Sequence, residues 1–142
     1  MEIRRITEFN EIVYQAVLNL LPQLDPAYPL PSRDDFKHII SDKNTWFLIC
    51  EKGSGEIAAM LTLVTYIIPT GRKFWIEDVV VDGQSRGQGL GRAIVERALD
   101  IAKKEGGKKA DLTSRPFRTA ANQLYRNMGF VPRETNFYRY EF

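Results

Sequence analysis

The sequence has few of the side chains that bind metals or form cross-links. Its 142 residues include one cysteine and one histidine. One cysteine cannot form an internal disulfide, and this pair does not supply the ligands of a structural zinc site, so we expect no metal. Cys50 lies in the apolar run TWFLICEK and is interpreted as a buried core residue. A chain without disulfides fits a reducing compartment, which predicts a cytoplasmic location.

Long apolar runs and a large charge of one sign are also missing. No stretch approaches the roughly 20 apolar residues of a membrane span, and the first residues, MEIRRITEFNEI, contain no signal-peptide core. The net charge is only +2. The lysines at 103, 104, 108 and 109 are interpreted as a solvated helix end, because no stacking aromatic residues lie between them. We therefore expect neither a membrane nor a nucleic-acid partner.

What is present indicates one globular domain spanning residues 1–142. Hydrophobic residues make up 44% and charged residues 27% of the chain, which is ordinary for a folded protein. Periodicity predicts strands at 1–7, 45–51, 56–68, 72–82, 110–114 and 135–142, and helices at 8–21, after Ser32, from 90 to 104, and at 118–128. The proline-rich segment LPQLDPAYPLPS is predicted to be a stiff, irregular loop. This order predicts an α/β layer with helices on both sides of a sheet.

The segment VVVDGQSRGQGLGRAIVERALD places three alternating glycines between a β-branched run and an amphipathic helix. Free backbone N–H groups at a helix start form an anion site, and glycine lets a ligand approach closely. A dinucleotide fingerprint would need a third glycine at Arg92 or Ile94, and a P-loop would need Gly-Lys-Ser/Thr. Neither spacing is present. The turn therefore predicts a phosphate cradle of another kind, the alternative being a plain strand-to-helix turn.

Arg86-x-x-Gly89-x-Gly91 is similar to the [QR]-x-x-G-x-[GA] segment of the GNAT N-acetyltransferase superfamily. The later segment NQLYRNMGF, with Asn122, Tyr125 and Gly129, resembles the end of a conserved helix of that family. The resemblance is clearest from residue 75 to residue 142. It implies a GNAT fold, with a mixed central sheet of six to seven strands and about four helices on both faces.

The resemblance also implies acetyl-CoA as cosubstrate. The glycine turn would hold its pyrophosphate, the strand before it would pair with the pantetheine arm as in β-augmentation, and Asn122 would contact the same arm. The residues carried over in this way are Val79, Val80, Val81, Arg86, Gly87, Gln88, Gly89, Leu90, Gly91 and Arg92.

Two residues are candidates for proton transfer during acetylation of an amine. Glu77 is a carboxylate inside the apolar strand FWIEDVVV, where burial would raise its pKa and suit it as a base, directly or through a water. The alternatives are an exposed strand position or an ion pair with an arginine. Asp78 is expected on the opposite face unless a bulge resets the alternation. The resemblance gives Tyr125 the role of general acid, the alternative being a core aromatic residue.

Acceptor choice is expected to lie in the proline-rich loop and in the loop after Ser114. Arg115 and Arg118 are candidates for binding a substrate carboxylate or phosphate, with solvent exposure or a contact to CoA phosphates as alternatives. Tyr28 and Tyr138 are candidate pocket residues. FWIEDVVV also resembles a strand of glucosamine-phosphate acetyltransferases, with Trp75 in place of their histidine.

These observations predict an acetyl-CoA-dependent N-acetyltransferase in which a primary amine attacks directly in a ternary complex. A small-molecule amine is favoured, and a peptide amine stays open. The alternatives are a non-catalytic acyl-CoA-binding or sensing module on the same fold and a nucleotide-binding α/β protein. The aromatic terminal run TNFYRYEF is expected to form a strand that packs across a homodimer, since an exposed edge of this kind promotes association.

Overall fold

The computed structural model describes residues 1–142 and places four antiparallel strands beside four α-helices. The strands are β1 (Glu2–Ile6), β2 (Thr45–Glu51), β3 (Ile57–Ile68) and β4 (Gly71–Val81), in that spatial order. The helices are α1 (Glu11–Leu24), α2 (Arg33–Ser41), α3 (Leu90–Lys104) and α4 (Thr119–Asn127), and a short 3-10 turn, η1, spans Gly83–Ser85. None of the helices has the length and apolar character needed to cross a bilayer.

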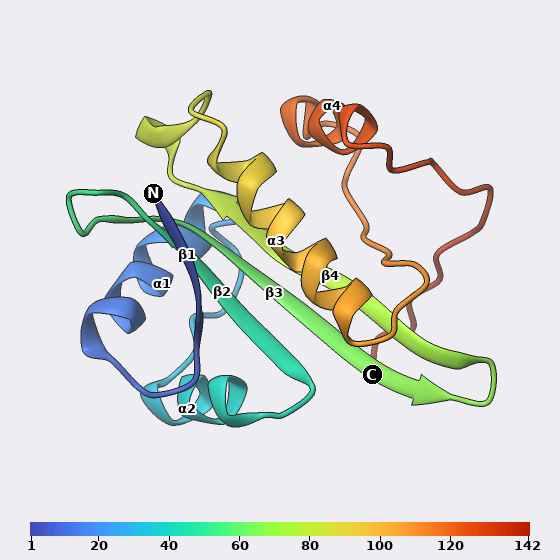
Figure 1. Cartoon of the computed structure of the whole chain (residues 1–142), viewed down its shortest axis with the longest axis horizontal. Coiled ribbons are helices and arrows are strands. Elements are labelled where there is room, and N and C mark those ends of the chain that lie inside the picture. Colours follow the sequence, from blue (N-terminus) through green and yellow to red (C-terminus); the bar gives the residue numbers. More distant parts are fainter.

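Helices lie on both sides of the sheet (Figure 1). Two separate hydrophobic clusters pack against the sheet. Strand β2 explains why both faces are covered, because its residues alternate between the clusters: Trp46 and Leu48 pack with α3, whereas Phe47 and Ile49 pack with α1 and α2. All four side chains are buried. The predicted α/β arrangement with four helices on both faces is therefore confirmed.

Local signals explain where two of the helices begin. Ser32 caps α2, accepting from the amide of Asp35 while the Asp35 carboxylate accepts from the amide of Ser32, a reciprocal capping box. Asn10 caps α1 by accepting from the amides of Ile12 and Val13. Helix α1 continues through Pro22 to Leu24, so the predicted loop begins later than expected. The buried Leu20 and Leu21 hold this last turn on the core.

The prediction of six to seven strands was wrong, since the sheet has four. Of the predicted strand at 110–114, only Asp111 pairs with β4, through one isolated parallel bridge to Trp75. The predicted strand at 135–142 has no strand partner. The tail instead runs from α4 as a long extended segment (Figure 1). Both segments depended on long-range partners, which periodicity does not reveal.

Candidate functional site

The glycine turn presents a row of free backbone donors. Gly87 and Gly89 have φ angles of +75° and +80°, and Gly89 is the N-cap of α3. No backbone N–H from residue 86 to residue 92 donates a hydrogen bond within the protein. These seven groups lie at the positive end of α3, where an anion is stabilised by both the donors and the helix dipole. The predicted cradle therefore presents free donors, and its role in holding a pyrophosphate stays a prediction.

Gly91 also serves the packing of this turn. A Cβ at Gly91 would lie 3.3 Å from Cδ2 of Leu124 and 3.4 Å from Cγ2 of Val81. The first turn of α3 thus approaches the end of β4 and the side of α4 closely. A Cβ at Gly87 or Gly89 would meet no atom within 4 Å. Gly87 and Gly89 therefore leave open space above the donors, whereas Gly91 lets the start of α3 pack closely against its neighbours.

Strand β4 contains a bulge at Asp78. Thr62 pairs with Glu77 and Met60 with Val80, so β4 has one residue more than β3 between these pairs. Asp78 has a φ of +48°, the only positive φ outside glycine in the chain. Strained backbone of this kind is typical of functional sites. The bulge resets the side-chain alternation, which was the exception allowed in the prediction for Asp78.

Beyond the bulge, one edge of β4 is open. The amide of Ile76 donates to Asp111, but no backbone bond joins residues 77–81 to the 112–116 segment. On the opposite edge, the amide of Asp82 donates to the carbonyl of Ala58 in β3. Because backbone groups alternate in direction along a strand, Val79 and Val81 point theirs toward the open edge, and Val80 points toward β3. Of the three predicted valines, Val79 and Val81 thus have backbone groups free for an extended ligand.

Glu77 and Asp78 place two carboxylates at this opening. Burial, with the adjacent charge of Asp78, raises the pKa of Glu77. Burial also raises the pKa of Asp78, and the charge of Arg118 opposes that rise. Both residues are nevertheless exposed, which fits the alternative of an exposed strand position for Glu77. Neither forms an ion pair, which removes one alternative interpretation of Glu77. A carboxyl with a raised pKa accepts a proton more readily near neutral pH.

Tyr125 lies on α4, buried in the same cluster as α3. Its residue is 9% exposed, and its ring meets that of Phe130 edge to face, with centroids 5.6 Å apart. The hydroxyl forms no hydrogen bond in the protein, and it is not among the fully enclosed oxygens without a partner, so it reaches solvent. Burial raises the pKa of this phenol, opposed by the charge of Arg118. Tyr125 therefore keeps its proton and has no internal acceptor for it.

Arg118 connects the two halves of the site. Its charge acts on both Asp78 and Tyr125. Its guanidinium also donates to the carbonyl of Leu24 at 3.2 Å, which ties the start of α4 to the end of α1. The predicted role in substrate binding stays a prediction. The structure adds that Arg118 fixes the border between the proline-rich loop and α4.

Arg115, Tyr28 and Asn122 are the remaining residues predicted to contact the acceptor or CoA, and they differ in exposure and in hydrogen bonding. Arg115 is exposed and has no ion pair, and Tyr28 is 37% exposed in the proline-rich loop. The side-chain amide of Asn122 donates to the carbonyls of Arg115 and Arg118, both at 2.9 Å. Asn122 therefore braces the 115–118 turn, which leaves only its Oδ1 for the predicted contact with a CoA arm.

Ser114 is a residue that the sequence did not single out. Ser114 lies three residues after Asp111, and Asp78 lies three residues after Trp75. Both residues therefore follow the Trp75–Asp111 bridge by the same number of positions. Its Oγ is enclosed by protein and has no hydrogen-bond partner. An unsatisfied buried hydroxyl is uncommon and suggests a missing partner. A serine in a loop gives no sequence signal of this kind, because the signal is the lack of a neighbour in space.

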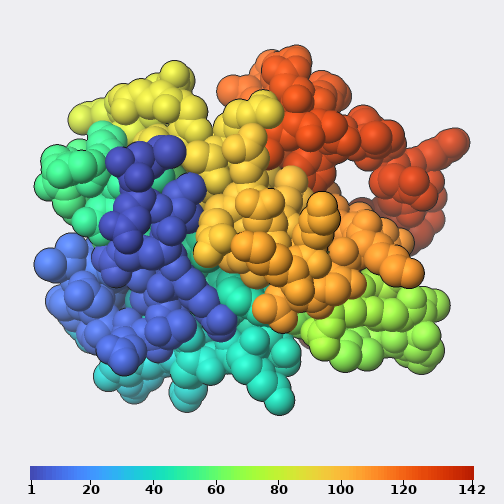
Figure 2. Space-filling view, viewed as in Figure 1, coloured from blue at the N-terminus to red at the C-terminus, as the bar shows by residue number.

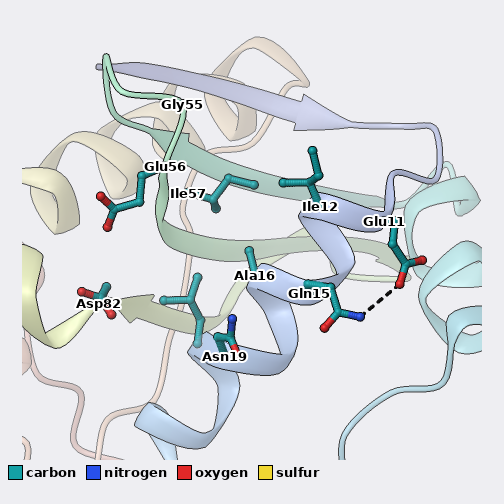
Figure 3. A pocket seen from close by; sticks show the side chains of 10 residues that line it. Glu11, Ile12, Gln15, Ala16, Asn19, Gly55, Glu56, Ile57 and Asp82 are labelled. Carbon is teal, nitrogen blue, oxygen red and sulfur yellow. Dashed lines mark hydrogen bonds between the residues drawn. The ribbon is translucent and has the colours of Figure 1, made fainter.

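A separate hollow of about 510 Å³ lies between α1 and the turn joining β2 to β3 (Figure 3). Its three carboxylates already have partners: Glu11 binds Arg33 and Gln15, Glu56 binds Lys52, and Asp82 binds Gln23. The hydrogen bond from Arg33 lowers the pKa of Glu11 to about 2. No residue of the 86–92 turn lines this hollow, nor do Glu77 and Tyr125. It lacks the free donors and proton carriers that distinguish the β4 opening.

The chain is similar to known acetyltransferases over most of its length. The profile of the Acetyltransferase (GNAT) family matches residues 11–130. Glucosamine 6-phosphate N-acetyltransferase 1 of Oryza sativa is 32% identical over 127 residues, covering 84% of this chain and 75% of that protein. Mycothiol acetyltransferase of Beutenbergia cavernae is 30% identical over 99 residues, covering 66% of this chain and only 32% of that protein. The chain thus spans about a third of that relative's length.

Solved structures share the fold. A putative acetyltransferase from Agrobacterium tumefaciens superposes with a TM-score of 0.87 at 22% identity, covering 99% of this chain and all of the other. At that identity the likeness concerns the fold alone. The same arrangement of sheet and helices therefore occurs in proteins whose sequences have diverged widely.

Proposed function

The chain belongs to the acetyltransferase (GNAT) family, and we propose that it is an acetyl-CoA-dependent N-acetyltransferase that acetylates a primary amine. The observation that carries this proposal is the row of seven free N–H groups at residues 86–92, beside the open edge of β4. The donors suit a pyrophosphate, and the backbone groups of Val79 and Val81 suit an amide-bearing arm. Together they match two chemically different parts of CoA.

Residues of the opening then supply proton transfer. Glu77 takes the proton of the attacking amine, directly or through a water, as the new C–N bond forms. Tyr125 gives its proton to the thiolate released as the C–S bond breaks. The raised pKa of each group supports these directions, because a more basic carboxyl accepts a proton readily and a phenol of high pKa is protonated before it donates. Backbone donors of the β4 edge polarise the thioester carbonyl.

The acceptor we favour is a small-molecule amine. Two relatives carry the names of small molecules, mycothiol and glucosamine 6-phosphate. The carboxylates of Glu77 and Asp78 attract a cationic amine to the opening, and the exposed Arg115, which has no ion pair, is our candidate for binding an acidic group on the same substrate. A non-catalytic acyl-CoA sensor on the same fold is the alternative, and it needs no proton carriers.

A thiol-release assay tests the proposal. The protein is incubated with acetyl-CoA and a panel of amines, amino sugars and peptides, and free CoA is measured. We expect release with at least one small amine. Binding of acetyl-CoA without release for any amine supports the sensor instead. Thermal stabilisation by NADH or ATP, but not by acetyl-CoA, contradicts both.

A further inference from the structure

One face of the β3–β4 hairpin extends beyond the helices that cover the rest of that side of the sheet. The buried cluster on the side of α1 and α2 includes only Met60 from β3 and Val80 from β4. Figure 2 shows the far end of the hairpin, in green, projecting from the molecule at the lower right. The side chains between that cluster and the hairpin turn form what we call the β3–β4 strip: Thr62, Val64, Tyr66, Lys73, Trp75 and Glu77. The strip therefore begins at the candidate base.

Strand register places the six side chains of the strip on one face, because side chains alternate along a strand. The indole of Trp75 donates to the hydroxyl of Tyr66 at 2.9 Å, which requires a shared face. Phe74 and Ile76 lie on the other face, buried in the cluster with α3. The strip residues are all exposed or half-buried instead. They pair across the two strands, Thr62 with Glu77, Val64 with Trp75, and Tyr66 with Lys73.

The end of the strip nearest the hairpin turn has two donors without an acceptor. The ammonium of Lys73 forms no ion pair. The hydroxyl of Tyr66 accepts from Trp75, but its own proton has no acceptor in the protein. Residues directly opposite each other in an antiparallel sheet have neighbouring side chains, so Lys73 and Tyr66, which we call the donor pair, can reach one ligand. A carboxylate or phosphate suits them, because it accepts charge-assisted hydrogen bonds from both.

We propose that the acceptor lies along the β3–β4 strip, with its amine at Glu77, an apolar ring or chain against Trp75, and a carboxylate or phosphate at the donor pair. This inference rests on the proposed function and names the acceptor class, an amine joined to an acidic group by an apolar spacer. Residues 73 and 77 are roughly 13 Å apart along the strand. With Trp75 between them, an α-amino acid is too short to reach both ends.

Trp75 supplies the apolar contact between the two charged ends. It is half-buried and belongs to neither hydrophobic cluster, so part of its indole is open to a ligand. Its hydrogen bond to Tyr66 holds the ring in place before a ligand arrives. Aromatic side chains provide a large apolar area, and a ring that is already fixed loses little entropy on binding. The strip is therefore an ordered surface with an acid, an aromatic ring and a base in sequence.

Paired acceptors test the strip in the CoA-release assay. Phenethylamine and its para-carboxy derivative differ only in an acidic group, and glucosamine and glucosamine 6-phosphate differ only in a phosphate. For at least one pair we expect kcat/KM to be about tenfold higher with the acidic member, the effect of one hydrogen bond to a charged group. Lys73→Ala should bring this ratio close to one. Arg72→Ala is the matched control, because Arg72 bonds to Thr65 on the other face, and it should keep the ratio.

Two further variants test the middle of the strip and the donor hydroxyl. Trp75→Ala should raise KM for both members of the preferred pair, and Trp75→Phe should restore most of the loss. Tyr66→Phe should lower the ratio while keeping the ring. Because neither residue belongs to a hydrophobic cluster, the variants should fold, which far-UV circular dichroism verifies. An unchanged KM in Trp75→Ala would contradict the ring contact.

Calorimetry on the protein saturated with CoA separates this inference from the proposed function. If no amine releases CoA, the proposed function fails, and the ratio of Kd values within each pair still tests the strip. Equal values within both pairs, or no binding of any of the four amines, would overturn the inference. So would a ratio that survives Lys73→Ala but is lost in Arg115→Ala, which would place the acidic group at the loop after Ser114.

Discussion

Trp75 and Asp111 form a single parallel bridge, and no further bridge joins β4 to the segment after Asp111. The Asp111 amide donates to the carbonyl of Phe74 at 3.0 Å, and its carbonyl accepts from the amide of Ile76 at 2.9 Å. The bulge at Asp78 follows within three residues. The bridge therefore sets the point from which β4 has an open edge, and so positions the candidate site.

Gly107 supports this bridge, because it packs against Phe74. A Cβ at Gly107 would lie 2.7 Å from the ring of Phe74 and 2.7 Å from the carbonyl oxygen of Ala102. We expect Gly107→Ala to lower the free energy of unfolding by about 1–3 kcal/mol, as overpacking does. Gly53→Ala is the control, since no atom lies within 4 Å there. Urea unfolding measures both, and equal effects would contradict the close contact.

The left-handed N-cap at Gly89 should affect stability and ligand binding together. A side chain costs about 1–2 kcal/mol in this conformation, so Gly89→Ala should lose stability and distort the row of donors. We expect acetyl-CoA binding to weaken about tenfold, or about 1.4 kcal/mol. Gly106→Ala is the matched control, with a φ of +85° and no atom within 4 Å. It should lose similar stability yet bind normally by calorimetry. Equal binding losses would exclude a specific role for the turn.

Features encoded by neighbouring residues could be predicted from the sequence. Ser32 and Asp35 are three residues apart and cap each other. Gly87 and Gly89 form a turn where the sequence predicts one, and both have a left-handed φ. The apolar run at 45–51 became β2 with the predicted bounds. In each case the interacting groups lie within a few residues, so composition and spacing carry the information.

Features that depend on distant contacts could not be predicted. The bulge occurs at an aspartate, which does not signal a left-handed residue as glycine would. The segment after Asp111 has strand-like composition, but its partner strand turns away. The amide of Asn122 is occupied by the carbonyls of a loop whose path the sequence does not give. In each case the three-dimensional arrangement, not the residue type, determines the role.

Asp78 should tune the proton affinity of Glu77. Burial raises the pKa of Glu77 most, and the charge of Asp78 adds to that rise. Asparagine tolerates a left-handed backbone, so Asp78→Asn keeps the bulge and removes only the contribution of this charge. The base works when deprotonated, so its raised pKa places the acidic limb of kcat/KM at higher pH. We expect this limb to move to lower pH in Asp78→Asn and to disappear in Glu77→Gln. Glu8→Gln, at an exposed position, should leave the profile unchanged. An unmoved limb in Asp78→Asn would show that the two carboxylates are not coupled.

Tyr125 and Tyr14 offer a paired test of the general acid. The Tyr125 hydroxyl has no partner in the protein, so Tyr125→Phe should leave thermal stability nearly unchanged while kcat falls by roughly 10²–10⁴. The Tyr14 hydroxyl donates to the carbonyl of Pro31 at 2.8 Å, so Tyr14→Phe should cost about 1 kcal/mol of stability and keep kcat. Acetyl-CoA binding should persist in both variants. If Tyr125→Phe retains full turnover, another group or water protonates the thiolate, and this tyrosine is a core aromatic residue.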